Sequence, residues 1–338
     1  MLHSVNLLLR IQFEEPSLDR MEESASSIRR PNGTVGNLGI SDDLNNLSTS
    51  SEQGVRRTLV YVRVMQARDI PFAVKLTDTE DWGFDRRDFV RLLQLDPRGC
   101  FLAIHDGNKA GLITTTTYDR FAWVGNVIVA MSSRGRGIGV ELLDHAISYA
   151  KEKGIRKVGL YSYLKTRALY EDSGFVEGER FVRYRGIPKA RKKTKVSLFE
   201  DEYLKRIARF DRDRFGADRE RYLKILGRDF PRLFLFSKED DRILGYIVAK
   251  GGPSGYEIGP WICDSDTPQS VGGLLDGLLD RMKGKIVEIT IPKNNHRAAL
   301  MIRDSGFSRV GEVAEMFRGG FPKRRQNTIF AVGGLEKG

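Results

Sequence analysis

The chain contains little cysteine and little histidine for its 338 residues. Its two cysteines, Cys100 and Cys263, lie inside apolar runs in different halves, and its four histidines are scattered. Two isolated thiols do not form a disulfide framework, and without a CxxC pair or an HExxH-like spacing no zinc site is recognisable. We therefore expect no metal cofactor, a reducing compartment and a cytoplasmic location.

Long apolar runs are also missing. No stretch approaches the ~18 residues that a membrane-spanning helix needs. Acidic residues between Glu14 and Glu23 argue against a secretory or transit signal near the beginning of the sequence. We therefore expect no membrane partner.

Negative charge is in deficit, with 56 Lys and Arg against 45 Asp and Glu and a net charge of +11. Such a surplus favours anionic partners, including phosphorylated cofactors and nucleic acids. The densest basic run, Pro188–Lys195, has no aromatic residues interleaved with it, so we interpret it as a solvated linker. This disfavours a nucleic-acid partner and leaves a homodimer open.

The composition changes along the chain and predicts two domains. Ser24–Gly54 is rich in serine, asparagine and glycine and has no periodicity, so we expect residues 1–54 to be a disordered tail. We expect a first domain over 55–187, a basic linker over 188–196 and a second domain over 197–338.

Hydrophobic periodicity predicts the same order of elements in both halves. In the first half we expect strands at 59–66, 100–105, 110–116, 121–131, 157–163 and 175–185, and helices at 67–77, 85–95, 138–153 and 166–173. In the second half we expect strands at 233–237, 243–250, 256–263, 286–291 and from 307 onward, and helices at 201–215, 218–227, 269–283 and 295–305.

Short sequence matches, two of them identical and one conservative, support an internal duplication. The matched pairs are Asp172–Phe175 with Asp304–Phe307, Lys153-Gly154 with Lys283-Gly284, and Val124-Gly125 with Ile258-Gly259.

A glycine-rich loop between an apolar strand and an amphipathic helix is the feature with the clearest chemistry. It consists of Arg134, Gly135, Arg136, Gly137, Ile138 and Gly139. Glycines let the backbone approach a ligand closely, and the first amides of the helix point outward without internal partners. Together with the helix dipole and the two arginines, these amides favour a pyrophosphate.

Two other phosphate-binding loops fit poorly. A P-loop ends in Gly-Lys-Ser or Gly-Lys-Thr, which this loop lacks. A dinucleotide fingerprint needs a third glycine where Val140 stands, and it follows the first strand of a βαβ series rather than a meander of hairpins.

Arg134-x-x-Gly137-x-Gly139 resembles the acyl-CoA pyrophosphate motif of the GNAT superfamily of N-acetyltransferases. Leu169-Tyr170 followed by Gly174-Phe175 resembles a second conserved element of that superfamily, and the order of elements over 57–186 is also similar. The resemblance implies an α/β (α+β) fold of two tandem GNAT-like domains. Each would be a mixed, mainly antiparallel twisted sheet flanked by helices.

The second half resembles the degenerate partner domain of tandem GNAT proteins, with Gly-Pro-Trp in a central strand and Met316–Gly319 late in the sequence. Its counterpart of the loop, Ser265–Gly273, has no RGxG, and Ile302 stands where Tyr170 stands in the first half. We therefore expect it not to bind CoA in the same way, and to wall an acceptor groove or offer an interface.

By this resemblance, acetyl-CoA is the co-substrate, and its pantetheine enters between the strand 127–131 and its neighbour 157–163. It would bond free amides near Ile128 and Val129, one of which would polarise the thioester carbonyl. Tyr170 is the expected general acid, since a phenol of pKa ~10 can protonate a departing thiolate of pKa ~8.5.

The acceptor is expected to be an amine of a small molecule or a protein, and the sequence does not name the base that deprotonates it. Acidic and aromatic residues stand where GNAT acceptor sites usually form: Glu80, Asp81, Trp82, Tyr118, Asp119 and Trp123. Two alternatives remain open. One is a module that binds acyl-CoA without turnover, and the other is a basic nucleic-acid-associated protein.

Overall fold

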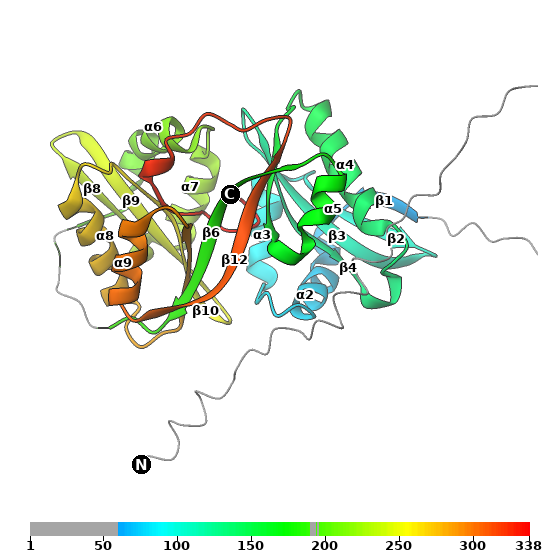
Figure 1. Cartoon of the computed structure of the whole chain (residues 1–338), viewed down its shortest axis with the longest axis horizontal. Coiled ribbons are helices and arrows are strands. Elements are labelled where there is room, and N and C mark those ends of the chain that lie inside the picture. Colours follow the sequence, from blue (N-terminus) through cyan, green and yellow to red (C-terminus); the bar gives the residue numbers. More distant parts are fainter. Residues whose placement is uncertain (1–59, 190–193, 195) are drawn as a thin grey trace, which may run out of the picture.

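The computed structural model describes residues 60–189, 194 and 196–338 (Figure 1). The predicted tail, 1–54, and most of the predicted linker lie outside the described residues. In the part of the chain that is described, no helix is both long enough and apolar enough to cross a membrane.

The first half contains the predicted elements, with ends that differ by a few residues. Its strands are β1 (Val60–Val64), β2 (Cys100–His105), β3 (Asn108–Thr117), β4 (Ala122–Val129), β5 (Val158–Tyr163) and β6 (Val176–Gly186). Its helices are α2 (Ile70–Asp78), α3 (Arg86–Leu95), α4 (Ile138–Glu152) and α5 (Arg167–Asp172).

The second half repeats this order, with the short strand β7 in the place of β1, and adds one short strand, β13, after β12. The periodicity separated neither β7 nor β13. Its strands are β7 (Ser197–Leu198), β8 (Phe234–Glu239), β9 (Arg242–Gly252), β10 (Gly255–Cys263), β11 (Val287–Pro292), β12 (Phe307–Arg318) and β13 (Ile329–Ala331). Its helices are α6 (Leu204–Phe215), α7 (Glu220–Asp229), α8 (Pro268–Arg281) and α9 (His296–Asp304).

All the strands form one sheet, because the two halves exchange a strand. The order is β1-β2-β3-β4-β5-β12-β6-β11-β10-β9-β8-β7, with β13 paired to β10. β12, from the second half, pairs antiparallel with β5, whereas β6, from the first half, pairs antiparallel with β11. The two exchanged strands lie side by side through the middle of the molecule (Figure 1).

Helices cover both faces of each half. In the first half, α4 and α5 pack on one face, and α2 and α3 pack on the other. In the second half, α8 and α9 occupy one face, and α6 and α7 the other. The fold is therefore a mixed, mainly antiparallel α/β fold repeated in tandem, as the sequence predicts.

Candidate functional site

The central feature of the first half is a split between the parallel strands β4 and β5. They pair only at Ala122–Val124 with Val158–Leu160, and within the described residues no strand pairs into the space beyond. A bulge in the β3–β4 register, where Asn126 has a φ of 49°, bends β4 away at this point. Beyond Val124 and Leu160 the facing backbones of β4 and β5 are therefore not paired with each other, as an extended ligand bonding to strand backbone would require.

The glycine-rich loop connects the open end of this split to α4. Gly135 and Gly137 have φ values of 75° and 76°, and Gly137 is the N-cap residue of the helix. A Cβ atom built on Gly137 would meet no atom within 4 Å, so this backbone is freely approachable. The amides of Val140 and Glu141 already bond to the Gly137 carbonyl, and those of the preceding residues have no intrahelical partner.

Arg134 braces the loop. Its Nε donates to the Val129 carbonyl at 3.1 Å, and its Nη2 lies 2.5 Å from Glu80 Oε1. Glu80, predicted as an acceptor-site acid, thus lies beside the loop as the partner of Arg134. Arg136 is exposed, so its guanidinium remains able to meet a ligand's phosphates.

Tyr170 lies on α5 in the hydrophobic cluster that α4 covers, on the same face of the sheet as that helix. It is 8% exposed, and its ring meets Phe175 edge-on at 6.1 Å between centroids. Burial, with a smaller effect from Tyr163, raises the pKa of Tyr170 to about 12. The hydroxyl is therefore a neutral proton donor throughout the neutral pH range.

The opposite face of the split is covered by the second half, which the sequence analysis expected to wall an acceptor groove or offer an interface, although it did not identify the segment that does so. The crossing segment, Gly333–Lys337, follows β13 and runs over β4. Trp123 Nε1 donates to the Leu335 carbonyl at 3.0 Å, and the Tyr118 hydroxyl donates to the Lys337 carbonyl at 2.7 Å. Glu336 lies directly over Gly125, where the split opens: a Cβ atom built there would be 2.4 Å from Glu336 Cα.

The other predicted acceptor residues are not gathered at this face. Asp119 accepts from Arg212 Nη2 and from the Asp218 amide, both at 2.7 Å, so it joins the two halves. Asp81 lies in the turn after α2 with a φ of 53°. Trp82 packs against the α2–α3 cluster.

A buried ion pair lies on the face of the sheet opposite α4, with Glu315 on β12 and Arg324 in the segment that follows β12. Glu315, 2% exposed, lies opposite Tyr161 in the β12–β5 register, and its Oε1 is 2.5 Å from Arg324 Nη1. Burial raises the pKa of Glu315, and the neighbouring Arg324 opposes that shift. The Arg324 guanidinium is surrounded by four rings, from Phe121, Trp123, Phe215 and Phe317, at 5.0–5.6 Å.

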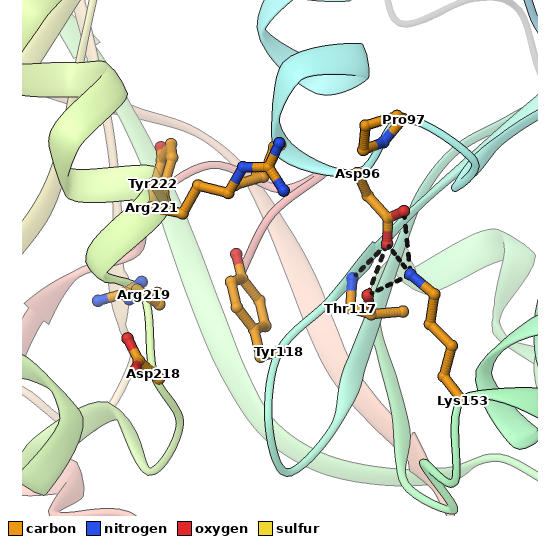
Figure 2. A pocket seen from close by; sticks show the side chains of 10 residues that line it. Asp96, Pro97, Thr117, Tyr118, Lys153, Asp218, Arg219, Arg221 and Tyr222 are labelled. Atoms are coloured by element: carbon orange, nitrogen blue, oxygen red, sulfur yellow. Dashed lines mark hydrogen bonds and ion pairs between the residues drawn. The ribbon is translucent and has the colours of Figure 1, made fainter.

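A small cavity of about 150 Å³ between the halves is a separate feature (Figure 2). One of its lining residues, Asp96, accepts hydrogen bonds from Thr117, Tyr149 and Lys153. The cavity lies where β3 ends and β4 begins, at the opposite end of β4 from the glycine-rich loop. The Asp96 carboxylate already has hydrogen-bond partners within the chain, so we do not include this cavity in the functional site.

The equivalent positions of the second half lack these groups. Ile302, the counterpart of Tyr170, is fully buried and has no proton to donate. The turn before α8 contains Asp264, which pairs with Arg214 and Arg242. Across residues 60–189, 194 and 196–338, no three His, Cys, Asp or Glu side chains are placed to hold a metal ion.

The first half thus combines split parallel strands with a glycine-rich loop at a helix N-terminus, and the second half is an altered copy of it. A sequence profile for the Acetyltransferase (GNAT) family matches residues 65–175, and one for an Acetyltransferase (GNAT) domain matches 207–331. The chain belongs to the GNAT family of acetyltransferases and carries two GNAT domains in tandem.

Two curated relatives agree with this assignment. The chain is 24% identical over 264 residues to holothin acyltransferase from Pseudoalteromonas sp. (strain SANK 73390), covering 77% of this chain and 88% of that protein. It is 33% identical over 135 residues to N-alpha-acetyltransferase MAK3 from Arabidopsis thaliana, covering 37% and 70%.

Solved structures show the same fold. A candidate acetyltransferase from Pyrococcus horikoshii superposes with a TM-score of 0.70 at 23% identity, covering 87% of this chain and 99% of that one. A tandem GNAT protein from the clavulanic acid biosynthesis pathway superposes with a TM-score of 0.54 at 14% identity, covering 78% and 100%. At these identities the likeness concerns the fold alone.

Proposed function

We propose that the protein is an N-acetyltransferase that moves the acetyl group of acetyl-CoA to a primary amine by direct attack in a ternary complex. The observation that carries the proposal is the β4–β5 split, which opens beside the loop from Arg134 to Gly139. The two curated relatives described above are named for different acceptors, so for this protein we propose only the chemical class of the acceptor, a primary amine.

The fit of the cofactor rests on open backbone. Gly137 leaves its surroundings free, and Gly139, two residues further into the helix, would contact only Val129 Cγ2 if it bore a Cβ atom. We propose that Arg134, Gly135, Arg136, Gly137, Ile138 and Gly139 hold the pyrophosphate through amides, the helix dipole and Arg136. Ile128 and Val129 would line the pantetheine.

The reaction then requires two proton movements. Acetyl-CoA supplies the acetyl carbonyl carbon, to which the amine nitrogen bonds as the carbon–sulfur bond breaks. The attacking amine is uncharged. Once its nitrogen has bonded to the carbonyl carbon, that nitrogen loses one proton, which water or a carboxylate on the covered face accepts. Tyr170 donates its phenolic proton to the departing sulfur and recovers it from solvent.

We further propose that the acceptor enters on the face that carries Tyr118 and Trp123, opposite α4, because Tyr170 and the loop occupy the α4 side.

Both Cys100 and Cys263 are buried and unpaired. We take these reduced thiols as support for a cytoplasmic location.

A thermal-shift titration with acetyl-CoA tests the proposal. A ligand at 100 times its dissociation constant stabilises a protein by about 2.7 kcal/mol, so a clear rise in Tm is expected. Gly139→Glu, which places a carboxylate in the first turn of α4, should abolish the rise. Gly139→Ala is the matched control, because its Cβ lies an ordinary 3.8 Å from Val129, and it should retain the rise.

An unchanged Tm for the wild-type chain at saturating acetyl-CoA would refute the proposal. If acetyl-CoA still raised the Tm of Gly139→Glu, acetyl-CoA would bind at a site other than this loop.

A further inference from the structure

The second half contains a split of its own, at the position equivalent to the first. β10 and β11 run parallel and pair only at Tyr256–Ile258 with Val287–Ile289. The last paired residue, Ile258, is the counterpart of Val124 in the duplicated words of the sequence. Each half therefore opens its sheet after the same residue of the same strand.

The second split is filled by the chain itself. β13 pairs antiparallel with β10, at Trp261 with Ala331 and at Ile262 with Ile329. On its other side, the amide that follows β13, that of Val332, donates to the Thr290 carbonyl of β11 at 3.1 Å. An extended segment thus bonds to both strands of the split.

The filling is apolar and closely packed. Ile329, Phe330 and Ala331 are all buried, and the Phe330 ring lies 4.9 Å from that of Trp261. Asn295, the N-cap residue of α9, also donates to the Ile329 carbonyl at 3.1 Å. Burial on this scale, with backbone bonds on both edges, makes spontaneous departure of β13 costly.

We propose that β13 is an intramolecular substitute for pantetheine, so that the second split is permanently occupied and each chain holds one acyl-CoA, in the first split. The inference rests on the proposed function, because it assumes that an extended pantetheine arm is what the first split receives. The second half has in this way lost a cofactor site and gained a structural strand.

The turn that precedes α8 agrees with this occupancy. Where the first half has Arg134 and Arg136, this turn has Asp264 and Asp266, and the helix begins with Pro268, which has no amide proton. Asp264 is paired with Arg214 and Arg242, but the negative charge of Asp266 and the missing amide proton of Pro268 still disfavour a pyrophosphate even if β13 were to leave the split.

The residues that follow β13 connect the two splits. Lys250 Nζ and the Tyr222 hydroxyl donate to the Gly333 carbonyl at 2.6 Å each, which fixes the chain as it leaves the second half. The crossing segment then covers Trp123 and Gly125 of β4. Occupation of the second split therefore anchors the segment that walls the acceptor side of the first.

Calorimetric titration of the full chain with acetyl-CoA tests the stoichiometry. We expect one molecule per chain in the wild type and in Gly311→Ala, whose added Cβ atom would meet nothing within 4 Å, and none in Gly139→Glu. Two molecules per chain, or binding that remains in Gly139→Glu, would overturn the inference. An absence of binding in the wild type would instead contradict the proposed function.

A cysteine pair tests the position of β13 independently of acetyl-CoA. Ile262 and Ile329 are opposite each other on antiparallel strands and pack in the same cluster, so Ile262→Cys with Ile329→Cys should oxidise to a disulfide. Each single variant is the matched control. The oxidised chain should bind acetyl-CoA with unchanged stoichiometry and affinity.

Failure of the pair to oxidise in the folded chain would show that β13 does not occupy the split. A stoichiometry that falls from two to one on oxidation would show that acetyl-CoA normally displaces β13. Either result would contradict the proposal that β13 takes the place of pantetheine in the second split. Neither result depends on whether the first split binds acetyl-CoA.

Discussion

At the scale of single residues, burial determines what Tyr170 can do. Tyr170 is buried in an apolar cluster, and the resulting pKa of about 12 keeps its hydroxyl protonated well above neutral pH. A group in that state serves as a proton donor and cannot serve as the base that the amine requires. The base must therefore come from elsewhere.

Replacing Tyr170 by Phe should lower kcat by roughly 100-fold, the usual contribution of a general acid, without changing the Tm rise produced by acetyl-CoA. Tyr163→Phe, on the adjacent strand end, is the control and should remain within a few-fold of wild type. Steady-state release of the CoA thiol measures both variants. Equal loss in the two variants would contradict the specific role of Tyr170.

Gly125 is the residue that admits the crossing segment. Gly125→Ala would place a methyl group 2.4 Å from Glu336 Cα, which is backbone and cannot rotate away. We expect the free energy of unfolding in urea to fall by about 1–3 kcal/mol, as for other overpacked sites. Gly311→Ala, whose Cβ would meet nothing within 4 Å, should change it little. Equal effects would show that Glu336 does not lie there.

The residues of the loop could be predicted from sequence because phosphate binding depends on local backbone, and a strand, glycines and a helix follow one another there. The acceptor face could not, because Leu335 and Glu336 reach β4 from more than 200 positions away. Glu80 and Asp119 are acidic residues near the right place in the sequence, but the fold gives them partners in Arg134 and Arg212.

At the scale of elements, a buried ion pair lies where β12 is inserted beside β5, with Glu315 on β12 and Arg324 in the segment that follows it. Glu315 and Arg324 are each almost completely buried, so removing one charge leaves the other without compensation. Arg324→Leu should lower the free energy of unfolding by about 3 kcal/mol. Glu315→Leu with Arg324→Leu should recover most of that loss, since no unpaired charge remains.

Chemical denaturation of the two variants measures the difference. A double variant no more stable than the single one would mean that the pair does more than balance charge, for example by fixing the register of β12.

The helices and most strands could be predicted because each has its own apolar periodicity and its own end signals. The hairpin at Asp106-Gly107 is an example, with φ values of 49° and 75° that the sequence pattern requires. β13 was not separated from β12, although Thr328–Val332 is a short apolar run. The position of β13 is determined by the point at which β10 and β11 stop pairing, and no local sequence pattern reveals that point.

At the scale of the whole molecule, the strand exchange makes the halves interdependent. β5 would become an edge without β12, and β6 would lose both neighbours. We expect residues 1–187 alone to lack a cooperative thermal transition, and co-expression with 188–338 to restore one. Circular dichroism with size exclusion measures this. A folded, monomeric first fragment that binds acetyl-CoA would contradict it.

The duplication was visible in the sequence, but the exchange was not. Both copies end with the same Asp-Ser-Gly-Phe word followed by a strand, so either strand is locally compatible with either sheet. The choice is made by long-range contacts such as Trp123 with Leu335 and Tyr118 with Lys337. Sequence similarity therefore predicts two similar domains and leaves their intertwining open.

Hydrogen exchange of the full chain with and without acetyl-CoA tests the central claim most directly. The account predicts slower exchange in β4 and in the loop and first turn of α4, from Asn126 to Val140, and no change between Asp264 and Gly273. Protection of the second segment, or of neither, would contradict an acetyl-CoA site in the first split.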